Sequence, residues 1–89
     1  MAKTSTRDQE LITKYIELDP DRPWRDRARI IGYGVEVWSL IGYLKGMDGN
    51  RAEVAAGFDL PVEAIEAAEA YYRRHKEIID NRIDPEGDL

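Results

Sequence analysis

With 89 residues, the chain is long enough for one small domain with a thin hydrophobic core. Charged residues make up 35% and hydrophobic residues 43%, proportions typical of soluble globular proteins. The absence of cysteine excludes disulfides and zinc sites with thiolate ligands. The stretch MAKTSTRDQELITK has no apolar run, so we expect no signal peptide and no membrane span, and a cytoplasmic protein.

The net charge of −5 is distributed unevenly. Residues 1–45 hold eight Lys or Arg and seven Asp or Glu, whereas residues 46–89 hold five and eleven. This asymmetry indicates that the two halves bind different partners or pair with each other. The simpler alternative is a solvated acidic helix face in the second half.

The N-terminal part predicts a flexible segment and then a small β element. Residues 1–13 are polar and expected to be flexible. The segment LITKYIELD predicts a short strand that ends at Asp19-Pro20. After a loop, β-branched residues predict a second strand over 27–31, and the two glycines of residues 32–34 predict a turn.

Two helices are predicted next. Apolar residues at helical spacing begin at Val37, and Gly46 is a natural helix end. Asn50 with Glu53 forms a capping-box pattern for a short second helix. This helix is expected to end near Gly57 or Phe58.

A long third helix is predicted from Pro61, because no helix breaker occurs before Asp84-Pro85. Roughly 20 residues span about 30 Å, more than a compact domain of this size needs. The folded domain is expected over 14–83 and a disordered tail over 84–89. We expect the second half of the helix to be covered by the N-terminal strands or by a second subunit. The residues predicted for a homodimer interface are Tyr72, Ile79 and Ile83.

The second and third helices have the spacing of a helix-turn-helix. The residues that fall at its buried positions are Val54, Ala55, Phe58, Leu60, Ile65 and Ala68. The predicted fold is therefore mostly α: a homeodomain-like three-helix helix-turn-helix domain with a short N-terminal two-stranded β element and a long C-terminal helix. However, the face that should read DNA carries Glu63, Glu66 and Glu69, and a duplex repels such a face. The alternative for this row is a solvated helix face.

Four arginines, Arg22, Arg25, Arg27 and Arg29, surround the second predicted strand. The last three alternate, so a strand would place them on one face, and an arginine-bearing ribbon can enter a major groove. Two alternatives remain open. The arginines pair with the acidic residues of the last helix, in the same chain or a dimer mate, or they keep an exposed strand edge soluble.

The two tryptophans have different expected roles. Trp38 lies beside the apolar stripe of the first predicted helix and is expected in the core. Trp24 lies in a charged loop with little apolar sequence around it. It is expected either to pack locally or to anchor an interface, because Trp and Arg are enriched at binding hot spots.

Catalysis has little support in the sequence. His75 is the single histidine, and nothing marks the partner or pocket that a general base needs. The row of glutamates lacks the Glu-x-x-His motif of two-helix metal sites. We therefore expect a protein that is not an enzyme and has no metal or cofactor.

The segments YIELDPDRP, ARIIGYGVEVWSLIGYL and VAAGFDLPVEAIEAAEAYYRRHKEIIDNRI resemble the prokaryotic family catalogued as domain of unknown function four-thirty-three. The resemblance covers roughly residues 14–83. It implies similarity to antitoxins of the VapB type, a helix-turn-helix fold that is often dimeric, and a gene beside that of a PIN-like nuclease toxin. One departure is clear: Gly32-Tyr33-Gly34 stands where members commonly have Gly-Thr-Arg.

The resemblance implies a non-enzymatic antitoxin that dimerises and binds a PIN-like toxin. PIN-type active sites gather acidic residues around a metal, which a basic or aromatic segment suits. The predicted contacts are Trp24, Arg25, Arg27 and Arg29, or the C-terminal residues Arg73, Arg74 and Lys76. The alternative is a DNA-binding autorepressor that contacts operator DNA through Arg22, Arg25, Arg27 and Arg29.

Overall fold

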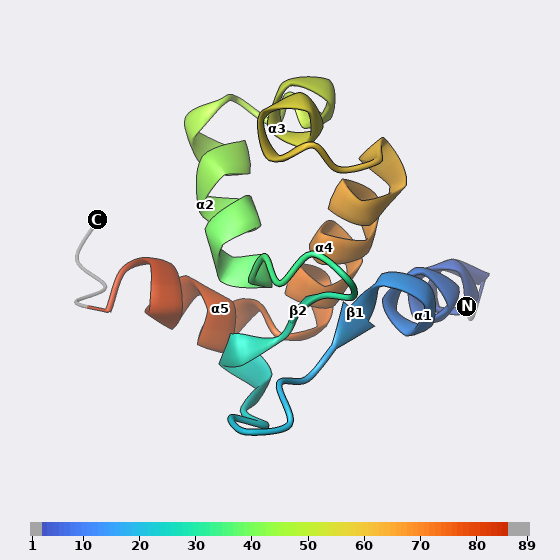
Figure 1. Cartoon of the computed structure of the whole chain (residues 1–89), viewed down its shortest axis with the longest axis vertical. Helices are drawn as coiled ribbons and strands as arrows, with labels where there is room; N and C mark the ends of the chain where they lie inside the picture. Colours follow the sequence, from blue (N-terminus) through green and yellow to red (C-terminus); the bar gives the residue numbers. More distant parts are fainter. Residues whose placement is uncertain (1–2, 86–89) are drawn as a thin grey trace.

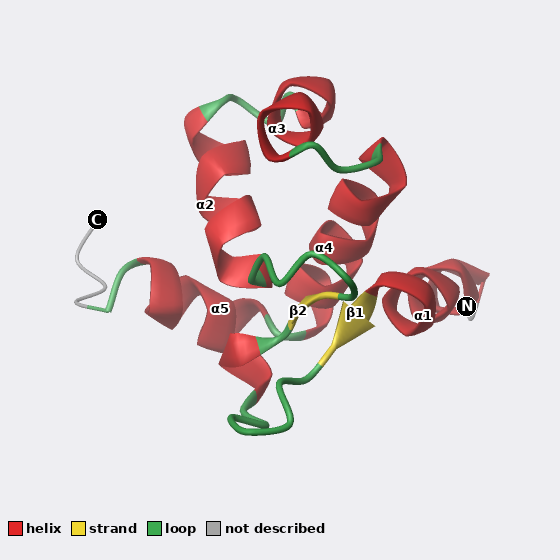
Figure 2. Ribbon diagram, viewed as in Figure 1, coloured by secondary structure: helices red, strands yellow, loops and turns green. Residues whose placement is uncertain are grey.

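Helix α4 (Val62–Arg74) lies at the centre of the fold, and the other helices pack around it (Figure 1). The computed structural model describes residues 3–85, which are mostly helical with one small antiparallel sheet (Figure 2). None of the helices described is long and apolar enough to cross a membrane. The other elements are α1 (Lys3–Tyr15), β1 (Ile16–Glu17), the 3-10 helix η1 (Arg25–Arg27), β2 (Arg29–Ile30), α2 (Val37–Gly46), α3 (Arg51–Phe58) and α5 (Lys76–Ile83).

The central position of α4 follows from its alanine-rich sequence. Ala64, Ala67, Ala68 and Ala70 are fully buried, and no side chain from Ala64 to Tyr71 is exposed. Alanine favours helix and keeps the helix thin, so α1, α2 and α3 can each approach it closely.

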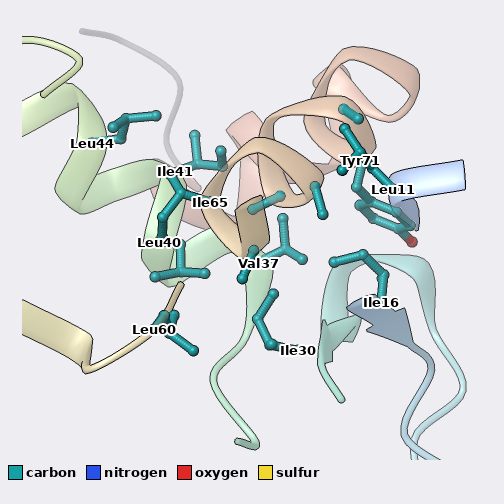
Figure 3. Packing of buried hydrophobic residues seen from close by; sticks show 14 of the residues in the cluster. Leu11, Ile16, Ile30, Val37, Leu40, Ile41, Leu44, Leu60, Ile65 and Tyr71 are labelled. Carbon is teal, nitrogen blue, oxygen red and sulfur yellow. The ribbon is translucent and has the colours of Figure 1, made fainter. Parts of the chain in front are cut away.

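The hydrophobic core lies between α2, α4 and the β element (Figure 3). The burial predicted for residues of α3, of α4 and of the turn between them is confirmed. Val54, Ala55, Leu60, Ile65 and Ala68 are buried, and Phe58 packs against the core. The largest fully buried side chains are Ile30, Leu40, Ile65, Ile79 and Val37.

The predicted ends of α2 and α3 are confirmed. The Asn50 side chain accepts a hydrogen bond from the Glu53 backbone N–H at 3.1 Å and so caps the start of α3. Asp59 ends this helix in the left-handed conformation, with φ of 60°. Leu60 then donates its N–H to the Ala55 carbonyl at 2.9 Å, which closes the turn into α4.

The prediction of a flexible segment over 1–13 is wrong for the residues that are described, because α1 occupies Lys3–Tyr15. Leu11, Ile12 and Tyr15 recur at helical spacing, and Leu11 is buried. This stripe packs α1 onto α4, an arrangement that polar composition alone did not suggest. Residues 1 and 2 lie outside the described residues.

The β element is smaller than predicted. Ile16 pairs with Ile30 and Glu17 with Arg29 in an antiparallel ladder of two residues on each strand. The segment LITKYIELD is helical up to Tyr15, and the predicted second strand is shortened because η1 precedes it. The turn over 32–34 is confirmed: Gly32 and Gly34 both have positive φ, which glycine adopts without strain.

The single long C-terminal helix is a further wrong prediction. The helix breaks at His75, where φ is −132° and ψ is 41°, and α5 takes a new direction. After the break, α5 packs on α2 and η1, and Ile79 enters the core. Of the predicted tail over 84–89, the part after Pro85 lies outside the described residues.

Candidate partner-binding groove

A shallow groove of about 690 Å³ lies between the loop around Trp24 and helix α5 with the preceding His75. It exists because α5 leaves the axis of α4 at His75 and runs beside η1. We call it the Trp24 groove. Its lining residues are Leu18, Pro23, Trp24, Arg25, Asp26, His75, Ile78 and Asn81.

Hydrogen bonds to the backbone hold the loop in shape. Asp19 Oδ1 accepts from the Asp21 N–H at 2.9 Å, and the Asp19 carbonyl accepts from the Arg22 N–H at 3.1 Å. The Trp24 carbonyl accepts from the Arg27 N–H at 2.9 Å and begins η1. The order of this loop therefore does not depend on burial of the Trp24 side chain.

The buried helix α4 supports the groove from below. Tyr71, itself buried, donates its hydroxyl to the Arg25 carbonyl at 2.8 Å. Burial raises the pKa of this hydroxyl, so it remains a hydrogen-bond donor well above neutral pH. The Tyr71 ring also lies 4.4 Å, centroid to centroid, from the ring of His75 at the helix break. One side chain thus positions both walls of the groove.

Trp24 is the most exposed large apolar side chain of the structure's described part, with 59% of its surface accessible. Leu18 is exposed beside it, and Ile78 is half-buried on the opposite wall. A large aromatic surface on a fixed backbone loses little conformational entropy on binding. The prediction that Trp24 is an interface anchor therefore has the exposure that it requires, whereas Trp38 packs against the core as expected.

Charged groups of both signs lie at the groove. Burial lowers the pKa of His75, and the positive charges of Arg25 and Arg74 lower it further. The imidazole is therefore held uncharged at neutral pH by neighbours that would attract an anion. Asp26 is the single carboxylate among the lining residues.

The predicted arginine strand face is wrong. Arg25 and Arg27 lie in η1, so they do not alternate with Arg29 along one strand. The Arg27 guanidinium lies 3.5 Å from a carboxylate oxygen of Glu36. Arg29 donates to Glu17 at 2.8 Å and lies 3.5 Å from Asp19. Both charges are neutralised by neighbouring carboxylates, none of which belongs to the last helix.

Arg22 and Arg25 are the two arginines of this segment that remain exposed. Within residues 3–85, neither guanidinium forms an ion pair. Of the two, only Arg25 lines the groove. The structure therefore brings together Trp24 and Arg25 from the predicted partner-binding set.

The three C-terminal cations bind within the chain. Arg73 donates twice to the carboxylate of Asp8, at 2.7 and 3.3 Å, and Arg74 donates to Gln9 at 2.7 Å. Lys76 donates to the Tyr72 hydroxyl at 3.2 Å and to the Asp80 carboxylate at 3.3 Å. Arg73 and Lys76 therefore belong to other surfaces, and Arg74 contributes its charge next to His75.

The prediction that Ile79 lies in a dimer interface is wrong. Ile79 is fully buried in the core and cannot contact a second subunit. Tyr72 is half-buried and donates its hydroxyl to Asp80 at 2.7 Å, and Ile83 packs against the core. The cause is the break at His75, which turns this face inward.

The acidic row of α4 pairs with cations of the same chain and is not a freely solvated face. Glu63 accepts the Tyr15 hydroxyl at 2.7 Å and lies 3.5 Å from Lys14 Nζ. Glu66 lies 3.5 Å from Arg7, and Arg51 donates to Glu69 at 2.6 Å. At Glu63 and Glu66 the two halves of the chain pair with each other, which is one of the alternatives that the charge asymmetry left open, whereas Glu69 pairs within the second half.

Of the eight residues that line the groove, only Trp24 and Arg25 were predicted as site residues, and the six that were missed include Leu18, Ile78 and Asn81. Leu18 could have been predicted, because an apolar side chain among acidic loop residues indicates a possible contact surface. The position of Ile78 and Asn81 depends on the break at His75, and no glycine or proline marks it. His75 is half-buried, and its role in shaping a groove was not foreseen.

No three Asp, Glu or His side chains of the described chain gather in a way that could hold a metal ion. Comparison of the chain with protein-family models, with curated proteins and with solved structures found no match. The resemblance to the family of antitoxin-like proteins therefore stays a prediction. The geometry and charge of the Trp24 groove are the main observations that bear on function.

Proposed function

We propose that the chain is a non-enzymatic, antitoxin-like protein that binds a partner protein through the Trp24 groove. The observation that carries this proposal is the exposure of Trp24, 59% accessible on a loop whose backbone is fixed. Aromatic side chains of this kind supply most of the energy at protein interfaces. Trp24 is also part of a continuous lining with Leu18 and Ile78, and it is not an isolated apolar side chain.

The shape of the groove supports a protein ligand over a small molecule. Small-molecule sites enclose most of the ligand surface, whereas the Trp24 groove is shallow and open to solvent. An extended segment or a helix edge of a partner can lie along it, with an apolar side chain against Trp24 and Leu18. Ile78 would contact the partner from the opposite wall of the groove.

The charge of the groove supports an acidic partner surface. Arg25 lines the groove, so a carboxylate of the partner beside its guanidinium gains a favourable interaction. The resemblance points to a PIN-like nuclease, whose active site gathers acidic residues. We propose that Trp24 and Arg25 contact that acidic site and thereby neutralise the nuclease.

Helices α2, α3 and α4 supply the scaffold in this proposal. Their order and the tight turn at Asp59 support a homeodomain-like helix-turn-helix. Because α4 is covered along its middle turns, we propose that this unit organises the protein surface and does not read bases. The small β element and η1 then present the groove.

The alternative function is an autorepressor that binds operator DNA. The exposed side chains of Arg22 and Arg25 support it, because phosphate contacts need unpaired cations. A gel-shift titration on the DNA upstream of the gene tests it at two salt concentrations. A shift that weakens with salt and is lost in the Arg22→Ala/Arg25→Ala double variant would establish DNA binding. No shift at low salt would remove it.

The partner proposal is tested by coexpression with the product of the neighbouring gene. The chain carries an affinity tag, and co-purification is compared between the original sequence, Trp24→Ala and Tyr33→Ala. Tyr33 is a matched control because it is also an exposed aromatic, 52% accessible, and does not line the groove.

We expect the neighbour to co-purify with the original chain and with Tyr33→Ala, and to be lost with Trp24→Ala. Equal recovery with all three chains would assign the contact to another surface. Failure of the neighbour to co-purify with any of them would contradict the antitoxin proposal itself.

A further inference from the structure

His75 is the single histidine of the chain, and it forms the joint between α4 and α5. Its N–H donates to the carbonyls of Tyr71 and Tyr72, at 3.0 and 3.1 Å, and so ends α4. Its carbonyl accepts a hydrogen bond from the Ile79 N–H at 3.1 Å and so begins α5. One residue therefore sets the change of direction between the two helices (Figure 1).

The side chain of this joint residue belongs to the Trp24 groove. The imidazole of His75 lines the groove and is half-buried there. Its ring centroid lies 4.4 Å from that of Tyr71, and the two ring planes are inclined by 40°. Ile78, in the first turn of α5, lines the same wall. The position of the imidazole therefore influences how far this wall stands from Trp24.

The charged groups that act on the imidazole are positive. Burial lowers the pKa of His75, and Arg25 of η1 and Arg74 of α4 lower it further. Asp26 lines the same groove, but it acts on the Tyr71 hydroxyl and does not offset the two arginines at the imidazole. Among residues 3–85, no carboxylate forms an ion pair with the imidazole.

Helix α5 supplies no charged side chain to this wall. The two residues of α5 that line the groove are uncharged, and Lys76 and Glu77, which follow His75, do not line it. An imidazolium at this position would therefore lie beside two guanidiniums without a counter-ion from the described chain. The face of the Tyr71 ring attracts a cation weakly and cannot neutralise it. The cationic form of the side chain is thus more stable in water than in the groove.

We infer that the Trp24 groove has two forms, which the protonation state of His75 selects. In the neutral form, the imidazole lies against Tyr71 and holds the wall of α5 in place. The imidazolium leaves Tyr71 for water, and the first turn of α5 moves away from the loop around Trp24. Ile79 stays in the core and limits the movement to this turn. Acidification through the range in which histidine titrates therefore widens the groove.

This device regulates the groove, so its consequence for a partner rests on the proposed function. A partner that fits the neutral form would be released on acidification, because it binds the two forms with different affinity. The chain alone is sufficient to detect the two forms. Failure of the pH response and failure of the partner proposal are therefore separate results.

NMR of the single imidazole tests the inference in the original chain. Spectra from about pH 5 to pH 8 cover the ordinary titration range of histidine. We expect His75 to titrate with a midpoint below its ordinary pKa of 6.5. Nuclear Overhauser effects between the rings of His75 and Tyr71 should be present above this midpoint and lost below it.

Two charge variants test whether the groove causes the shift. Arg25→Gln removes one of the two positive neighbours and should raise the midpoint of His75. Arg22→Gln is the matched control, because it removes the same charge from an exposed side chain that does not line the groove. It should leave the midpoint nearly unchanged. Equal shifts in the two variants would overturn the inference, because the groove then has no specific influence on the imidazole.

A fluorescence measurement tests the movement of the wall. In a Trp38→Phe chain, quenching of Trp24 by acrylamide, which is uncharged, should increase as the pH falls through the midpoint of His75. His75→Asn, shown to be folded by circular dichroism, should abolish this increase. The inference is overturned by a midpoint at or above 6.5, by the absence of any titration, or by ring contacts that persist in the imidazolium form. The same pH response in His75→Asn would overturn it as well.

Discussion

The contact of α1 with α4 and the Trp24 groove both contain positively charged side chains, but only the first region pairs them with carboxylates of the same chain. Where α1 meets α4, the charges of Arg7, Lys14 and Arg73 lie against carboxylates of the same chain. In the Trp24 groove, Arg25 has no such ion pair in residues 3–85, and the indole beside it is open to water. Positive charge alone therefore does not identify a binding site. The informative feature is charge and apolar surface that the chain itself leaves without partners.

The largest expected effect concerns the Arg73–Asp8 pair, which holds α1 on α4. The Asp8 side chain is 10% accessible and that of Arg73 is 53% accessible. Arg73→Ala leaves a buried carboxylate unpaired and should cost about 3 kcal/mol of unfolding free energy, whereas Asp8→Ala should cost about 1 kcal/mol. Chemical denaturation of both variants measures the difference. Equal losses would show that the pair is a surface interaction.

Trp24→Ala should weaken partner binding strongly and change the stability of the fold little. It removes a proposed interface anchor that makes no large contribution to the core. We expect partner affinity to fall about 30-fold, equivalent to about 2 kcal/mol, while the unfolding free energy changes by less than about 0.5 kcal/mol. Calorimetric titration and denaturation give the two values. A large loss of stability would place Trp24 with the structural residues of the α1–α4 contact.

A smaller effect is expected at the support of the groove. Tyr71→Phe removes the hydrogen bond to the Arg25 carbonyl and should cost about 1 kcal/mol of stability. It should also weaken partner binding, because η1 loses its attachment to α4. Tyr72→Phe is the matched control, since its hydroxyl bonds to Asp80 away from the groove. Loss of partner binding in both variants would mean that the hydroxyl of Tyr71 has no special role.

The smallest effect is the pH dependence of the α1–α4 contact. Hydrogen bonds from Arg73 to Asp8 and from Tyr15 to Glu63 lower the pKa of both carboxyls below their ordinary values of 3.8 and 4.5. A lowered folded pKa stabilises the protein above the ordinary value, and this contribution is lost as the pH falls through the folded pKa. Stability should therefore fall below about pH 4.5.

Glu63→Gln tests this pH dependence with little change of shape. We expect its loss of stability on acidification to be smaller than that of the original chain, and the difference to shrink at high salt. Denaturation curves at several pH values give the comparison. An unchanged slope would show that Glu63 titrates as it does in the unfolded chain.

Local rules predicted the elements that depend on neighbouring residues. The Asn50 cap, the helix end at Gly46 and the glycine turn after β2 all follow from short-range backbone chemistry. The burial of Val54 and Ile65 follows from helical spacing. The mostly helical class with a small antiparallel sheet was predictable for the same reason.

Features set by tertiary packing were not predictable. The break at His75 has no local signal, because the apolar spacing continues from Tyr72 to Ile79 as in a straight helix. It arises where α5 turns to pack on α2 and η1. The groove is a consequence of this turn, so Trp24 could be identified from its isolation in a charged loop but its opposite wall could not.

Fluorescence quenching in a Trp38→Phe chain tests the central claim most directly, because Trp24 is then the single tryptophan. Quenching by iodide and by caesium is measured at equal ionic strength and compared with free tryptophanamide. If the Trp24 side chain is exposed beside Arg25, both ions should quench its fluorescence strongly. Iodide should quench it more than caesium does, and Arg25→Gln should reduce this difference. Trp24 that is shielded from both ions, or quenched preferentially by caesium, would contradict the account.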